Sequence, residues 1–139
     1  MRVLLIGDIV GKSGRKALES ILPNLRQEEK IDFVVANGEN AAGGFGLTPE
    51  IAEAIFDSGV DVITSGNHIW DQREIFPSLD GELPIIRPAN YPSAAPGKGV
   101  VRIGGIAVIN LQGRVLSLIH ISEPTRRTPI SYAVFCLKK

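Results

Sequence analysis

Three apolar runs in this chain each lead into a short polar cluster. Val3–Ile6 precedes Gly7-Asp8, a second run precedes Gly38-Glu39-Asn40, and a third precedes Gly66-Asn67-His68. Short apolar runs bounded in this way are typical of buried strands. Because the carboxyl ends of parallel strands share one edge of a sheet, we expect the three clusters to lie in a single cleft. The spacing therefore predicts an α/β fold with a candidate site at that edge.

The segments between these runs carry helical patterns. Residues 12–30 place apolar side chains at helical spacing, and Pro23 inside that pattern predicts a kink or a break. Thr48 and Pro49 are typical of a helix start, and Gly59 is the expected end of that helix. The strands that the helices connect are expected at residues 3–6, 33–36 and 60–64.

The pattern becomes less regular after the third strand. Asp71 and Glu74 fit a capping box for a short helix that Pro77 would end. Prolines at positions 88, 92 and 96 predict a long loop, and a Gly-Gly pair between residues 100–103 and 106–111 predicts an antiparallel hairpin. The predicted fold is therefore a βαβαβ parallel sheet followed by a β-hairpin.

Composition excludes several classes of protein. The chain has 44% hydrophobic residues, but no apolar run approaches the roughly 20 residues that span a membrane. The N-terminal run is too short for a secretion signal, so we expect a cytoplasmic protein without a membrane partner. A net charge of zero argues against a nucleic-acid duplex as partner. The single Cys136 excludes a cysteine metal cage.

The residue types at the strand ends suit a metal site. Asp8 and Glu39 supply carboxylates, one of which can bridge two ions about 3.5–4 Å apart. Asn40 and Asn67 supply neutral oxygens that would not repel an incoming phosphate. His68 belongs to a residue type that titrates near neutral pH, so it can pass a proton to a leaving oxygen. The cluster therefore indicates an oxygen-rich metal site for an anionic substrate.

Each of these residues also has a plainer interpretation. Asp8 could cap the following helix, and Glu39 and Asn40 could form a turn. Asn67 could occupy a left-handed turn position, and His68 could be a structural histidine. Three polar clusters at three successive strand ends nevertheless favour the shared site.

Three further features of the sequence have more than one possible interpretation. Trp70 could line the pocket or belong to the core, and Arg87 could clamp a phosphate or form a surface ion pair. Residues 7–13 resemble a phosphate-binding P-loop, but only three residues separate the two glycines where the pattern requires four. We therefore do not expect nucleoside triphosphate hydrolysis.

Residues 1–114 resemble the N-terminal half of the YmdB-like branch of the calcineurin-like metallophosphoesterases. The motifs that carry the resemblance are Gly7-Asp8-Ile9-Val10-Gly11, Asn37-Gly38-Glu39-Asn40-Ala41-Ala42, Gly66-Asn67-His68-Ile69-Trp70-Asp71, Arg87-Pro88-Ala89-Asn90 and Asn110-Leu111-Gln112-Gly113-Arg114. The wider superfamily has Asp-x-His in its first motif and a bridging Asp in its second. This sequence departs from both, as the YmdB-like branch does.

The resemblance implies an αββα sandwich of two sheets, of which this chain holds about the first half. It also implies two divalent metal ions (Fe, Mn or Zn), with Asp8, Glu39 and Asn40 at one ion, Glu39 bridging, and Asn67 at the other. The implied reaction is hydrolysis of a small phosphodiester such as 2′,3′-cyclic AMP, by a metal-activated hydroxide with His68 as general acid. Homo-oligomerisation is left open.

The family completes its metal site with three histidines from its C-terminal half, whereas this chain has only His68 and His120. We therefore expect the chain as written to be a truncated, inactive phosphodiesterase. The alternative is a noncatalytic fragment, either one that retains nucleotide or metal binding or an assembly artefact.

Residues 115–139 differ from the body of the chain. They show neither sustained alternation nor helical spacing, and residues 117–126 resemble the translated read-through of a sequencing adapter. We expect a partial metallophosphoesterase domain over residues 1–114 and an artefactual, non-native tail over residues 115–139. The alternative is a natural extension in which a strand at Tyr132–Leu137 closes the sheet.

Overall fold

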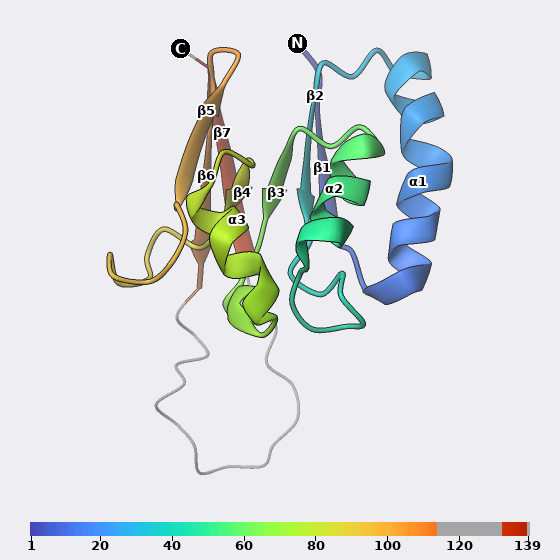
Figure 1. Cartoon of the computed structure of the whole chain (residues 1–139). Helices are drawn as coiled ribbons and strands as arrows, with labels where there is room; N and C mark the ends of the chain where they lie inside the picture. The colour runs from blue at the N-terminus through green and yellow to red at the C-terminus, as the bar shows by residue number, and fades with distance from the viewer. Residues whose placement is uncertain (114–131, 139) are drawn as a thin grey trace.

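A four-stranded parallel sheet organises the first part of the chain. The computed structural model describes residues 1–113 and the backbone of residues 132–138. The strand order in the sheet is β1-β2-β3-β4 (Figure 1). The strands are β1 (Val3–Asp8), β2 (Phe33–Asn37), β3 (Val62–Thr64) and β4 (Ile85–Ile86). The predicted parallel βαβαβ arrangement is confirmed, and β4 is a two-residue strand that the sequence pattern does not reveal.

Helices α1 (Gly11–Glu28) and α2 (Pro49–Asp57) cover one face of this sheet (Figure 1). α1 continues through Pro23, so the predicted break is wrong. The buried side chains of Leu18 and Leu22 pack into the core below the helix, and this burial outweighs the one backbone hydrogen bond that the proline removes. Among the described residues, no helix has the length and apolar composition of a membrane span.

α2 begins as the sequence predicts, because its first residues satisfy the free backbone N–H groups. Thr48 Oγ1 accepts a hydrogen bond from the backbone N–H of Ile51 at 3.4 Å, and Pro49 occupies the first turn. The helix ends just before Gly59, whose φ of 104° takes the chain out of the helical path.

The predicted capping-box helix is wrong in its details. The chain instead forms two 3₁₀ turns and a short helix, η1 (Asn67–Trp70), η2 (Arg73–Ile75) and α3 (Phe76–Asp80). Pro77 lies in the first turn of α3 rather than ending a helix, which is allowed because the first N–H groups of a helix have no partner inside it. The Asp71 side chain contacts His68 instead of capping.

A second, antiparallel sheet contains β5 (Val100–Ile103), β6 (Ile106–Gln112) and β7 (Tyr132–Lys138), in that order. Gly104 and Gly105 form the hairpin turn with φ values of 56° and 79°, so the predicted hairpin is confirmed. β7 pairs with β6 along its whole length. This strand lies where the alternative interpretation of the tail places one, whereas residues 114–131 and His120 lie outside the described residues.

β2 of the first sheet is buried on both faces. Val34 and Ala36 of β2 point into the core that includes Leu18 and Leu22 of α1. The alternate residues, Phe33 and Val35, pack with Ile106 and Val108 of β6 in a second core between the sheets. The described part of the chain therefore has three layers, helices, first sheet and second sheet, as Figure 1 shows.

Candidate active site

The last residues of the four parallel strands lie in register. Asp8 pairs with Asn37, Asn37 pairs with Thr64, and Thr64 pairs with Ile86. The turns that follow β1, β2 and β3 therefore start side by side at one edge of the sheet. This is the edge at which the sequence places its three polar clusters.

Asp8 and Asn40 are in direct contact at this edge. Asn40 Nδ2 donates a hydrogen bond to Asp8 Oδ2 at 2.8 Å, and the backbone N–H of Gly11 donates to Asn40 O at 3.0 Å. The N-cap of α1 is Val10, without a side-chain cap hydrogen bond, so the interpretation of Asp8 as a helix cap is wrong. Asp8 is exposed, and its second carboxylate oxygen has no hydrogen-bond partner within residues 1–113.

Glu39 is a buried carboxylate, with 1% of its surface exposed. Its backbone N–H donates to Asn37 Oδ1 at 3.0 Å, and Asn37 Nδ2 lies 3.4 Å from Glu39 Oε1. Among the described residues, Oε2 has no hydrogen-bond partner and Glu39 forms no ion pair. An ionised carboxylate buried in this way is unfavourable without a cation or donor nearby. Glu39 also lies in a turn closed by Ala41 N–H and Gly38 O at 3.1 Å, so the turn interpretation holds as well.

Asn67 contacts the second sheet. Its Oδ1 accepts a hydrogen bond from Gln112 Nε2 at 3.5 Å. Asn67 does not have a positive φ, because Lys30 is the one non-glycine residue with a positive φ in the described part of the chain. The left-handed turn interpretation of Asn67 is therefore wrong.

Tyr91 and Gln112 belong to this site although the sequence assigned them no role. Burial raises the pKa of Tyr91, the negative charge of Glu39 raises it further, and a hydrogen bond with Gln112 lowers it. Asn90 holds Gln112 in place, since Asn90 Nδ2 donates to Gln112 O at 2.6 Å and Gln112 N–H donates to Asn90 Oδ1 at 3.1 Å. In the sequence, the family motifs that contain Asn90 and Gln112 are the signal that could have pointed to this part of the site. Only the fold shows that Asn90 and Gln112 contact each other.

His68 lies in η1, next to Asn67. Its Nδ1 is 2.7 Å from Asp71 Oδ2, and its ring meets the Phe45 ring edge to face at a centroid distance of 5.2 Å. Nε2 has no hydrogen-bond partner among the residues described, and 29% of the side chain is exposed. Asp71 therefore orients the ring and leaves Nε2 available for proton transfer.

Arg87 fits neither interpretation proposed for it. It is 6% exposed, and its guanidinium donates hydrogen bonds to the backbone oxygens of Ala95, Pro88 and Pro92. A buried guanidinium engaged with the backbone is neither a phosphate clamp nor a surface ion pair. Trp70 is partly buried and donates from Nε1 to Pro96 O at 3.2 Å, so it packs against the same loop.

The oxygen chemistry of this edge fits divalent metal ions. The donors predicted from the sequence are Asp8, Glu39, Asn40 and Asn67. Three buried side-chain oxygens of the described residues lack a hydrogen-bond donor, namely Glu39 Oε2, Asn110 Oδ1 and Gln112 Oε1. A cation would satisfy such acceptors. Within the described part, however, no group of three or more His, Cys, Asp or Glu side chains is arranged around one point. The metal roles of the four donors stay predictions.

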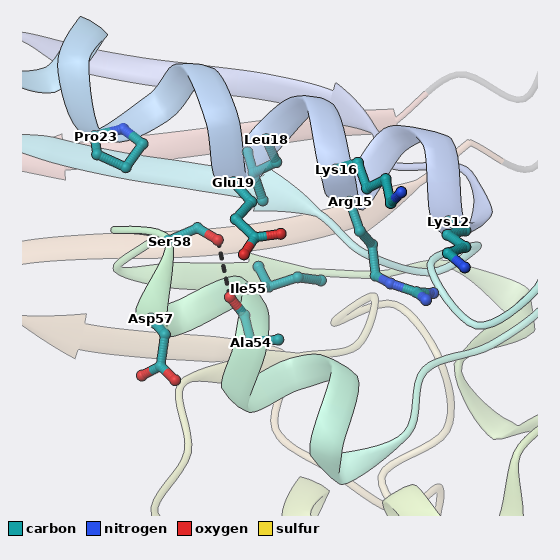
Figure 2. A pocket seen from close by; sticks show the side chains of 10 residues that line it. All are labelled: Lys12, Arg15, Lys16, Leu18, Glu19, Pro23, Ala54, Ile55, Asp57 and Ser58. Atoms are coloured by element: carbon teal, nitrogen blue, oxygen red, sulfur yellow. Dashed lines mark hydrogen bonds between the residues drawn. The ribbon is translucent and has the colours of Figure 1, made fainter.

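A separate pocket lies between α1 and α2. It has a volume of about 430 Å³, and Figure 2 shows Lys12, Arg15 and Lys16 along one part of its wall and Glu19 and Asp57 along another. None of the four predicted metal ligands lines it. Lys12, the lysine of the P-loop-like segment, lies on this helical surface.

Two solved structures share the fold of this chain. One match is the crystal structure of a hypothetical protein from Thermus thermophilus, with a TM-score of 0.70 and 43% sequence identity over 77% of this chain and 42% of that chain. Another is a novel phosphatase from Mycoplasma pneumoniae, with a TM-score of 0.67 and 29% identity over 76% of this chain and 40% of that chain.

Sequence comparison agrees with the structural matches. The chain is 49% identical to the 2′,3′-cyclic-nucleotide 2′-phosphodiesterase of Bacillus subtilis over 149 aligned positions, which cover 97% of this chain and 56% of that protein. The chain thus spans about half the length of the curated relatives that it matches. The profile of the YmdB-like proteins matches residues 4–133. This chain therefore belongs to the YmdB-like family, whose named relatives include phosphodiesterases and phosphatases.

Proposed function

We propose that this chain is part of a metal-dependent phosphodiesterase that acts on small phosphodiesters such as 2′,3′-cyclic AMP. The observation that supports this most strongly is the buried Glu39 carboxylate, whose Oε2 lacks a partner within residues 1–113, at the same sheet edge as the Asp8–Asn40 pair. The name of the Bacillus subtilis relative supports the substrate class. The zero net charge favours a small ester over a nucleic-acid duplex.

Two divalent ions, of iron, manganese or zinc, would be held by Asp8, Glu39, Asn40 and Asn67. When bound, they would supply positive charge against the phosphoryl oxygens and lower the pKa of a water molecule. The amide ligands suit this task because they add no negative charge near the ester.

His68 would act as the general acid. Asp71 Oδ2 lies 2.7 Å from Nδ1 and would accept its proton in a hydrogen bond, so a doubly protonated His68 would transfer the proton on Nε2. Cleavage of the 2′ P–O bond, by analogy with the Bacillus subtilis relative, adds the oxygen of water to phosphorus. The departing 2′ oxygen takes the Nε2 proton, and the product is a 3′-phosphate. A cytoplasmic location remains part of this proposal.

The 139-residue chain itself would be inactive. Its sequence has two histidines, and the described residues offer no cluster of three strong metal ligands. A site with so few strong donors binds metal weakly, because missing ligands remove both charge and preorganisation. The chain would then retain at most metal or nucleotide binding.

A comparison of two proteins tests this function. Resequencing of the genomic DNA beyond the codon for Arg114 gives the natural continuation, which we expect to encode a His-x-His pair and to lack residues 115–139 as written. With Mn²⁺, the continued protein should hydrolyse 2′,3′-cyclic AMP, whereas the 139-residue chain should not. Asp8→Asn should abolish the activity of the continued protein. Hydrolysis by the 139-residue chain that Asp8→Asn removes would contradict the inactivity, and no hydrolysis by either protein would contradict the function.

Glu39→Gln tests the metal site without an activity assay. We expect the variant to bind Mn²⁺ at least tenfold more weakly than the unaltered chain in isothermal titration calorimetry. It should also be more stable in urea by about 1–2 kcal/mol, because it removes a buried charge for which residues 1–113 supply no cation. Glu53→Gln, an exposed change on α2, is the control and should alter neither quantity. Unchanged Mn²⁺ binding in Glu39→Gln would exclude Glu39 as a ligand.

A further inference from the structure

Phe45 is an exposed aromatic ring beside the proposed general acid. Of its surface, 61% is exposed, and its ring lies 5.2 Å from the His68 ring at an interplanar angle of 69°. It belongs to the glycine-rich loop of residues 41–46, which directly follows Asn40 in the chain. Among the exposed large apolar side chains of the described residues, Phe45 is the aromatic one.

The loop that carries Phe45 is braced against the rest of the site. Within the loop, Ala42 N–H donates to Gly46 O at 3.0 Å and Phe45 N–H donates to Ala42 O at 3.2 Å. Gln72 Nε2 donates to Phe45 O at 3.1 Å from the segment that follows η1. The backbone of Phe45 is therefore fixed on two sides, while its side chain projects into solvent.

Glycine makes this close packing feasible. Gly46 has a φ of 80°, and a Cβ at that position would lie 2.7 Å from Gln72 Cγ and 3.2 Å from His68 O. The loop therefore lies against η1 only because position 46 lacks a side chain. This approach sets the Phe45 ring next to the His68 ring.

We propose that Phe45 is the stacking platform for the nucleobase of the substrate. This proposal rests on the proposed function. An apolar ring that a braced loop holds in water beside a reacting group is suited to a flat, partly apolar ligand. Every nucleobase has such a face, so stacking would select for the presence of a base rather than for a particular one. Because Phe45 contacts His68 edge to face, a base stacked on Phe45 would lie close to the ester whose leaving oxygen His68 protonates.

The test measures binding to the full 139-residue chain in the presence of Mg²⁺. The two probes are adenosine 2′,3′-cyclic monophosphate and glycerol 1,2-cyclic phosphate, which is a cyclic phosphodiester without a base. We expect the chain to bind the nucleotide roughly five- to hundredfold more tightly than the base-free ester. We also expect nuclear Overhauser contacts between the Phe45 ring protons and adenine.

Substitutions at position 45 distinguish the effect of an aromatic ring from the effect of side-chain size. Phe45→Leu should remove the preference for the nucleotide, and Phe45→Trp should keep it. Val10→Ala, a change of an exposed apolar residue that follows β1, is the control and should leave the preference intact. Circular dichroism confirms that the variants fold, which we expect because the Phe45 side chain is mostly in solvent.

Three outcomes would overturn the proposal. These are a nucleotide preference in Phe45→Leu equal to that of the unaltered chain, no preference in the unaltered chain, and no measurable binding of the nucleotide. Failure of the proposed function looks different. In that case the nucleotide preference and its loss in Phe45→Leu persist, while the continued protein shows no hydrolysis.

Discussion

Arg87 shows how a single charged residue can be misread from its sequence. A planar guanidinium in a proline-rich loop predicts a phosphate clamp or an ion pair, yet this one is buried and donates to three backbone oxygens of the following loop. Its hydrogen bonds fix the course of residues 88–95. That loop places Tyr91 and Asn90 next to the site.

Replacement of Arg87 should therefore act on stability. We expect Arg87→Met to lower the free energy of unfolding by about 2–4 kcal/mol, because three backbone oxygens lose a charged donor. Arg102→Met, at an exposed position of β5, should change it by less than about 0.5 kcal/mol. Urea denaturation of both variants measures the difference. Equal values for the two would show that the Arg87 hydrogen bonds do not stabilise the loop.

Tyr91 gives the stability of the chain a dependence on alkaline pH. Burial and the charge of Glu39 raise the pKa of its phenol above the usual 10.0. The folded state therefore keeps the phenolic proton at pH values where the unfolded state has lost it. This contribution to stability is complete below pH 10.0 and is lost as the pH rises through the folded-state pKa.

We expect the free energy of unfolding to fall above pH 10 with a slope of at most about 1.4 kcal/mol per pH unit from this group. Tyr91→Phe should remove that component. Urea denaturation at several pH values measures the slope. Absorbance titration of the phenols should also show a lower Tyr91 pKa in Glu39→Gln, and an unchanged pKa there would contradict the contact between the two groups.

The loop of residues 41–46 is the element whose local geometry matters most for the site. Its glycines differ in surroundings, although all look alike in the sequence. A Cβ at Gly43 would meet nothing within 4 Å, whereas one at Gly46 would collide with Gln72. Both have positive φ values, so an alanine is strained at either position.

Gly46→Ala should therefore destabilise the chain more than Gly43→Ala. We expect losses of about 2–3 kcal/mol and about 1 kcal/mol respectively, since only the first adds a steric collision to the backbone strain. Thermal and urea unfolding measure both. Gly46→Ala should also weaken the nuclear Overhauser contact between the Phe45 and His68 rings. A larger loss in Gly43→Ala would contradict the packing of this loop on η1.

Elements defined by local signals were predicted well. The start of α2 follows from the Thr48 cap and Pro49, and the hairpin follows from its two glycines. Elements that depend on distant partners were not. β4 is a strand because β3 lies beside it, and Pro23 stays within α1 because the sheet below it buries Leu22.

At the scale of the whole molecule, an open apolar groove runs beside β1 at the edge of the first sheet. Its volume is about 350 Å³, and Leu5 and Ile21, which line it, are 56% and 57% exposed. Such a surface favours association with other apolar surfaces.

We expect the 139-residue chain to self-associate through this groove. Leu5→Glu should weaken the association at least tenfold, because it places a charge in the apolar contact. Val100→Glu, at an exposed position of the second sheet, is the control and should leave it unchanged. Sedimentation velocity over a range of concentrations measures both. A monomeric unaltered chain would exclude the association.

The sequence by itself determined the parallel α/β sheet and the clusters at its strand ends, because strand patterns, caps and turns are local properties. It also carried the family motifs that predict Asp8, Glu39, Asn40, Asn67 and His68 as site residues, roles that stay predictions. Only the tertiary structure decided that Gln112 and Tyr91 join that edge, that Arg87 supports a loop and that Phe45 stands beside His68. Those contacts join segments far apart in the chain, and their partners are set by how two sheets and a glycine-rich loop pack.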